Sequence, residues 1–141
     1  VVRKLATRDD PALIEELQRQ LEMQASVPSN SVEDFINLDE RFHRTLAEAA
    51  GHRTVWSLIE GLKLQFDRVR FITSATFPTE MLLGQHRAIV ECIAARDQGG
   101  AEAAIRTHLR EVLAHLPEVT VTHPEYFEGR LPDDVSRSVN V

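Results

Sequence analysis

The sequence predicts an all-α protein, and three observations support this class. Apolar residues recur at spacings of three and four along most of the 141 residues, which is typical of amphipathic helices. The strict alternation of polar and apolar residues that marks a half-buried strand is almost absent. Aromatic residues make up only 6% of the chain, fewer than an all-β protein usually carries. Because the connections between the expected helices are short, we expect an antiparallel helical bundle.

The first expected helix covers residues 9–24. Its start is marked by Asp9-Asp10-Pro11, an acidic cap followed by a proline at the first helical position. Leu5 and Ala6 lie ahead of this helix and are expected to stay outside it. The apolar positions of the helix are Leu13, Ile14, Leu17 and Leu21.

The second expected helix follows a turn-rich linker over residues 25–31. Ser31 is its N-cap, with Asp34 three residues on as a weak capping box. Gly51 ends the helix as a C-terminal glycine. Its apolar stripe consists of Phe35, Ile36, Leu38, Phe42, Leu46 and Ala49.

Three further helices are expected over residues 54–73, 79–96 and 101–116. Gly99-Gly100 should terminate the fourth helix, and Pro117 should stop the fifth. The polar, proline-punctuated residues from 118 onward are expected to be extended or partly disordered. The apolar stripe of the third helix is Val55, Leu58, Ile59, Leu62, Phe66, Val69 and Phe71, and that of the fourth is Leu82, Leu83, Ile89, Val90 and Ile93.

Composition and charge exclude several classes. Sixteen basic against twenty-two acidic residues give a net charge of -6, which argues against direct binding of nucleic acid by this segment. No apolar run is long enough for a transmembrane helix, and the first residues do not resemble a signal peptide. The single cysteine, Cys92, excludes an intramolecular disulfide. We therefore expect a reducing, cytoplasmic location without membrane contact.

The sharpest local signal is the pair Asp39 and His43. Residues four apart on a helix project from the same face about one turn apart, so this carboxylate and imidazole can chelate a divalent cation together. Such a pair is also common as a simple surface hydrogen bond. The apolar neighbours of His43, including Ile36 and Leu46, indicate that it leans inward.

Two more histidines fall on the apolar sides of other helices. His86 precedes Ile89 by three residues on the fourth helix, and His108 follows Ile105 by three on the fifth. One buried histidine is usually satisfied within the core, but three with a carboxylate are more simply satisfied by one shared ion. Such a ligand set suits zinc, nickel or manganese rather than calcium. His115 lies seven residues after His108 on nearly the same face, and the pattern alone does not choose between them.

The motifs around these histidines resemble those of a known family. Residues 38–46, Leu-Asp-Glu-Arg-Phe-His-Arg-Thr-Leu, and then Ala-Ala-Gly-His at 49–52, are similar to the hallmark of the FCD domain. This is the C-terminal effector domain of FadR-type GntR transcription regulators. Residues 85–89 and 101–109 resemble the remaining two histidine segments of the family in order and spacing. The resemblance covers about residues 5–127, so we expect an effector domain over 1–127 and a flexible tail over 128–141.

The resemblance implies a bundle of about six helices with a central metal and ligand pocket. By matching motif positions, it assigns one divalent transition metal (zinc, nickel or manganese) to Asp39, His43, His86 and His108, which favours His108 over His115. It further implies a small organic-acid effector, a homodimer, and DNA contact only through an N-terminal winged helix-turn-helix domain that this chain lacks.

Three residues are candidates for contacting the effector. Arg68 and Arg70 resemble basic positions near the pocket in relatives, although each also fits a surface role. His52 stands where the family commonly has Asn, and Gln85 where it commonly has Glu. Both departures leave the four metal-binding positions intact.

Two other classes are compatible with a helical bundle of this kind. A small metalloenzyme would need a further acid or base beside the metal, and no second inward Asp or Glu at ligand spacing, beyond Asp39, is evident. A structural helical adaptor would bury these histidines without a metal. We expect no enzymatic activity and favour transcription regulation through effector sensing.

Overall fold

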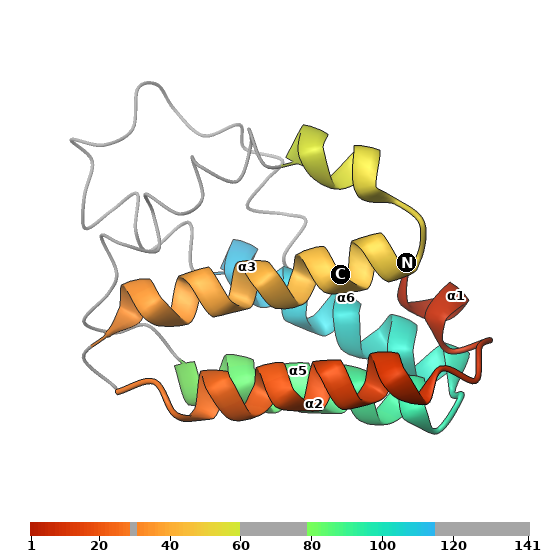
Figure 1. Cartoon of the computed structure of the whole chain (residues 1–141). Coiled ribbons are helices and arrows are strands. Elements are labelled where there is room, and N and C mark those ends of the chain that lie inside the picture. Colours follow the sequence, from red (N-terminus) through yellow and green to blue (C-terminus); the bar gives the residue numbers. More distant parts are fainter. Residues whose placement is uncertain (29–30, 60–78, 115–141) are drawn as a thin grey trace.

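The computed structural model describes residues 1–28, 31–59 and 79–114, and this part of the chain is helical with no β-strand (Figure 1). A further helical segment begins at residue 53 and continues through 59. The all-α prediction is confirmed. Within the described residues the other helices are α1 (Val2–Leu5), α2 (Pro11–Ala25), α3 (Val32–Ala49), α5 (Thr79–Ala94) and α6 (Gln98–Ala114).

The helices form an antiparallel bundle. Figure 1 shows that α2 and α3 run in opposite directions, as do α5 and α6. Helix α5 packs against both α2 and α6, while α2 also packs against α3. Helix α1 packs mainly against α6. The site-bearing helices α3, α5 and α6 are therefore parts of one packed unit. None of the helices in the described part is both long and apolar enough to cross a membrane.

The N-termini of α2 and α3 lie close to the predicted positions, but the N-cap side chain of α3 makes a different contact from the one expected. The Asp10 carboxylate accepts a hydrogen bond from the backbone N–H of Leu13 at 3.0 Å, and Pro11 is the first helical residue. Ser31 is the N-cap of α3 as predicted, but its hydroxyl contacts the Asp34 carboxylate instead of capping a backbone N–H. The capping box is therefore not formed in its usual way, because the two side chains bind each other.

Leu5 and Ala6 lie ahead of α2, as predicted, but a short helix that the sequence did not indicate places them in the core. Both are 1% exposed, and Leu5 belongs to α1. Lys4 Nζ donates to the carbonyl of Ala50 at 2.7 Å, and Arg8 donates to that of Ala49 at 2.8 Å. Basic side chains bind the unpaired carbonyls at a helix C-terminus favourably. These two contacts attach the N-terminal segment to the end of α3.

The boundary between α5 and α6 also differs from the prediction. Helix α5 ends at Ala94, and Gly99 and Gly100 lie in the first turn of α6 instead of terminating α5. The Asp97 carboxylate accepts a hydrogen bond from the Gly100 N–H at 2.8 Å. Because this carboxylate satisfies one of the unpaired N–H groups at the helix start, it offsets the low helix propensity of the glycines.

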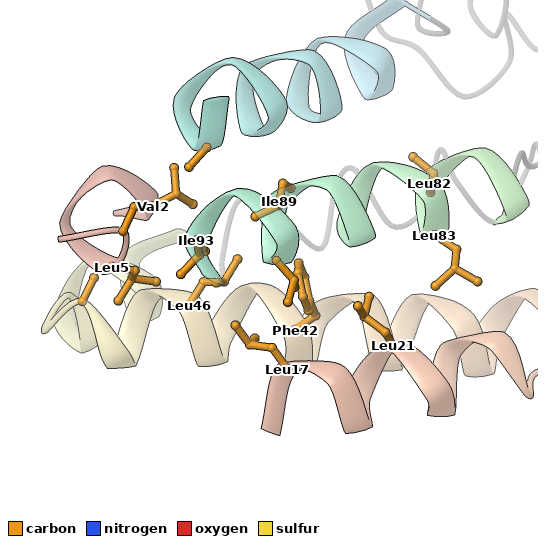
Figure 2. Close-up of a cluster of buried hydrophobic side chains, with 14 of the residues drawn as sticks. Val2, Leu5, Leu17, Leu21, Phe42, Leu46, Leu82, Leu83, Ile89 and Ile93 are labelled. Carbon is orange, nitrogen blue, oxygen red and sulfur yellow. The ribbon is translucent and has the colours of Figure 1, made fainter. Parts of the chain in front are cut away.

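The core lies between the helices and is formed by aliphatic and aromatic side chains (Figure 2). The predicted burial of the apolar stripes of α2, α3 and α5 is largely confirmed, but Leu13, Ile14, Leu38 and Ala49 are only partly buried. The residues of the core cluster are Val2, Leu5, Ala6, Leu17, Leu21, Phe35, Phe42, Leu46, Ala50, Leu82, Leu83, Ile89, Val90, Ile93 and Ala101.

The stripe expected at the start of the third predicted helix is wrong in phase. Val55 and Leu58 are 49% and 74% exposed, whereas Trp56 is 8% exposed. Positions 55 and 58 lie about 100° and 160° from position 56 on a helical wheel. Burial of the large Trp56 side chain therefore turns them outward. The remainder of that predicted helix lies outside the described residues.

Candidate metal centre

Four side chains from three helices meet at one point in the bundle. Asp39 and His43 come from α3, His86 from α5 and His108 from α6. One ligand atom from each lies within 4.8 Å of every other. Asp39 and His43 share a face because they are one turn apart on α3, and the packing of α5 and α6 brings the other two histidines to them. The structure thus brings together the four residues that the sequence and the resemblance selected.

Four of the separations between these atoms lie between 2.9 and 3.6 Å. The Nε2 atom of His108 lies 2.9 Å from that of His43 and 3.3 Å from that of His86. Asp39 Oδ1 lies 3.3 Å from His86 Nε2 and 3.6 Å from His43 Nε2. Bonds of about 2.0–2.2 Å from a metal to imidazole nitrogen or carboxylate oxygen place two ligands roughly 2.9 Å apart at a right angle and roughly 3.4 Å apart in a tetrahedron. These four separations are compatible with one transition-metal ion that the four residues could hold.

Two glutamines contact the outer nitrogens of these rings. The Nδ1 atom of His86 lies 2.8 Å from Oε1 of Gln24 on α2, and the Nδ1 atom of His108 lies 3.0 Å from Oε1 of Gln85 on α5. An amide oxygen accepts but cannot donate, so in each pair the ring N–H donates to the glutamine. The inner Nε2 atoms are then free of that proton and available as ligands.

Most of the cluster is buried. His86 and His108 are 0% exposed and Asp39 is 1% exposed, whereas the His43 side chain is 15% exposed. The Phe42 ring stacks on His86 with a centroid separation of 4.4 Å and an interplanar angle of 26°. The His43 ring stacks on His108 at 4.9 Å and 24°. Among these four residues, His43 is therefore the one at the edge that solvent reaches.

The other candidate residues do not join this cluster or lie beyond the described part of the chain. His52 is half-buried in the turn after α3, where its backbone N–H donates to the Ala47 carbonyl at 2.8 Å. Arg68 and Arg70, together with His115, lie outside the described residues.

Cys92 packs at the margin of the core. Burial raises the pKa of its thiol, and the neighbouring carboxylates of Asp97 and Glu91 raise it further. The thiol is therefore neutral at neutral pH and is a poor metal ligand. It is not a member of the four-residue cluster.

Sequence reasoning missed Gln24 and treated Gln85 only as a departure from the family pattern. A signal for Gln24 was present, since it continues the buried face of α2 that Leu17 and Leu21 define at helical spacing. A buried glutamine within an apolar stripe needs a polar partner, and here that partner is a histidine of the cluster.

Comparison with known proteins identifies the family to which this domain belongs. Residues 1–111 match the FCD domain. The HTH-type transcriptional repressor RspR of Escherichia coli K12 is 30% identical over 129 residues, which cover 90% of this chain and 57% of the relative. An uncharacterized HTH-type transcriptional regulator in an unstable DNA locus of Streptomyces ambofaciens is 33% identical over 119 residues, covering 84% of this chain and 50% of that protein. The chain spans about half the length of the curated relatives it matches. With most of its length matched to that family, this chain belongs to the FCD domain family of transcription regulators.

Proposed function

We propose that this chain is the metal-dependent effector-sensing and dimerisation domain of a bacterial GntR-type transcription regulator. Asp39, His43, His86 and His108 hold the metal, residues 1–127 form the domain, and residues 128–141 form its tail. The observation that carries this proposal is the convergence of four donor atoms, from three helices, within 4.8 Å of one another.

The chemistry of the donor set favours zinc or nickel. Three imidazole nitrogens and one carboxylate oxygen suit borderline metals, with manganese a weaker match and calcium unsuited. The separations of 2.9–3.6 Å around the cluster fit bonds of the usual length to one ion. A shared cation also satisfies several buried nitrogens at once, which would otherwise be costly to bury.

A small carboxylate is the effector class that this centre suits. When bound, a divalent metal with one carboxylate and three neutral imidazoles carries a net charge of about +1. An anionic ligand is favoured at such a centre. The side chain at the solvent-reached edge of the four is His43, so a small acid would approach from there. We assign Arg68, Arg70 and His52 to the effector pocket on the family resemblance alone.

The output of the domain is control of DNA binding. Both relatives described above carry HTH-type regulator names and are about twice as long as the matched region. In our proposal, a winged helix-turn-helix domain in the rest of the cytoplasmic protein contacts DNA, and a homodimer couples two such domains. The effector acts by shifting the population of two bundle conformations, without enzymatic turnover.

Metal content and stability measured together test this function. Tag-free protein is analysed for metals before and after dialysis against EDTA, and its melting temperature is recorded in both states. We expect about one transition-metal ion per chain, and a melting temperature that falls on chelation and recovers with Zn²⁺ or Ni²⁺. Small organic acids are then screened for a further rise in melting temperature. Absence of metal with an unchanged melt would favour the structural-adaptor alternative instead.

A further inference from the structure

Beyond the four ligands, two glutamines make matching contacts with the cluster. Gln24 contacts Nδ1 of His86, and Gln85 contacts Nδ1 of His108, at 2.8 and 3.0 Å. Gln24 is 2% exposed and Gln85 is half-buried. The two contacts come from different helices and follow the same pattern, an amide oxygen on the outer nitrogen of an inward-facing ring.

The orientation of the Gln24 amide is fixed by a second contact. Its Nε2 donates to the backbone carbonyl of Leu38 at 3.3 Å. A carbonyl only accepts, so the amide NH₂ must face Leu38 and the amide oxygen must face His86. The proton of the His86 ring is therefore on Nδ1, and its Nε2 presents a lone pair to the centre.

The Oε1 atom of Gln85 lies 3.0 Å from Nδ1 of His108 and can only accept, so the proton of this ring is also on Nδ1 and its Nε2 presents a lone pair. The inner nitrogens of His86 and His108 then face each other at 3.3 Å with no proton on either when both rings are neutral. Two facing lone pairs repel unless a cation lies between or beside them. By holding the ring protons on Nδ1, the two glutamines thus leave the Nε2 atoms able to bind a cation.

We infer that Gln24 and Gln85 are positioning residues that hold the His86 and His108 rings with Nε2 directed at the metal centre. This inference rests on the proposed metal-binding function. Because Gln24 belongs to α2, which supplies none of the four ligands, the centre connects four helices. Helix α5 contributes twice, since Gln85 orients the ligand from α6 while the adjacent His86 is itself a ligand.

The two glutamines are neutral acceptors. A carboxylate in either place would add a negative charge next to the imidazole, whereas an amide orients the ring without changing the charge of the centre. The net charge of about +1 assigned above to the loaded centre therefore depends on amides at both positions.

The first readout is the tautomer of each histidine in metal-free protein, measured by long-range proton–nitrogen NMR correlation at mildly alkaline pH. We expect His86 and His108 to carry their proton on Nδ1 in the wild type. Gln24→Leu should change the tautomer of His86 only, and Gln85→Leu that of His108 only. Gln85→Glu keeps an acceptor oxygen and should keep the wild-type tautomer.

The second readout is Zn²⁺ affinity from competition with a chelator. Each leucine variant should bind Zn²⁺ about 10–100-fold more weakly than the wild type does. The separate variant Gln85→Glu should keep tight Zn²⁺ binding. The matched control is Gln20→Leu, since Gln20 is 1% exposed on the same helix as Gln24 and contacts Glu16 and Thr45 instead of a histidine. Its Zn²⁺ affinity should equal that of the wild type.

Unchanged tautomers with unchanged affinity in both leucine variants would overturn the inference, as would an equal loss of affinity in Gln20→Leu. If Gln24→Leu does not fold, the Gln85 pair of variants decides, because a half-buried position tolerates substitution better. A wild type that shows the Nδ1–H tautomers but binds neither Zn²⁺ nor Ni²⁺ would contradict the proposed function, and with it the metal-positioning role, while still supporting the two hydrogen bonds from the rings to the glutamines.

Discussion

The Nε2 atoms of His43 and His108 lie 2.9 Å apart, although the two residues are 65 positions apart in the chain and belong to α3 and α6. Their rings are stacked with a centroid separation of 4.9 Å. At this distance the two nitrogens must share a proton or a cation, because two lone pairs or two N–H groups would repel each other. The contact ties the most exposed residue of the cluster to a fully buried one.

Removal of the buried ligand from α6 distinguishes two histidines that the sequence pattern left as alternatives. His108→Ala should abolish stoichiometric Zn²⁺ binding, because it removes the nitrogen nearest to both His43 and His86. His115→Ala should bind about one equivalent, as the wild type should, since the positions are about 10 Å apart along a helix. Isothermal titration of both variants measures this. Equal stoichiometry in the two variants would refute the assignment of His108.

Metal binding should depend on pH in the direction set by proton competition. A histidine ligand must be neutral to bind, and an ordinary imidazole becomes protonated below about pH 6.5. Zn²⁺ affinity should therefore be highest above neutral pH and fall steeply below about pH 6. Affinity that stays flat to about pH 4.5 would exclude coordination by histidines.

The cluster was predictable from the sequence because its signals are local. Asp39 and His43 are one turn apart, and His86 and His108 each fall on the apolar side of a helix, so burial phase alone pointed all of them inward. The resemblance then selected His108. What the sequence could not provide was the partner of each outer nitrogen, since Gln24 is 62 residues from His86.

Two of the differences between the predicted and the observed fold share a physical origin. Helix α1 has only four residues, too few for an apolar period, and it is held by packing against α6 and by hydrogen bonds from Lys4 and Arg8 to the end of α3. Local propensity alone predicts that Gly99-Gly100 ends a helix, but the Asp97 carboxylate caps these residues at the start of α6. In both places a tertiary or side-chain contact outweighs a weak local preference.

The ion pair between Arg3 of α1 and Glu102 of α6 makes a contribution to the free energy of unfolding that acid removes. Two hydrogen bonds hold the pKa of the Glu102 carboxyl below its ordinary value. The one from Arg3 has the larger effect, and the one from Arg106 follows. A carboxylate with a lowered folded-state pKa stabilises the fold above its unfolded-state pKa, and this contribution is lost as pH falls through the folded-state value.

Arg3→Ala should therefore lower the free energy of unfolding slightly at neutral pH, and its difference from the wild type should shrink as the medium is acidified. Because Arg3 is 60% exposed, added salt should reduce the neutral-pH difference as well. Urea denaturation across a pH series measures both effects. If the difference in unfolding free energy between Arg3→Ala and the wild type grew on acidification, the Arg3–Glu102 contact would not be the cause of the lowered pKa of Glu102.

Two helical glycines should respond to alanine in opposite directions. A Cβ at Gly84, in α5, would meet no atom within 4 Å, so Gly84→Ala should raise the free energy of unfolding by about 0.5–1 kcal/mol through helix propensity. A Cβ at Gly100 would collide with the Asp97 carboxylate and lie 3.0 Å from Cys92 Sγ. Gly100→Ala should therefore displace the cap of α6 and lower stability by about 0.5–2 kcal/mol.

The neighbouring Gly99 is the control for this comparison, because a Cβ there would make only an ordinary contact of 3.6 Å with Asp97. Gly99→Ala also changes a glycine in the first turn of α6, but it should not displace the Asp97 carboxylate. Thermal and urea denaturation of the three variants would separate helix propensity from the cap. If Gly99→Ala and Gly100→Ala were equally destabilised, the loss would come from the backbone of the turn and not from the Asp97 contact.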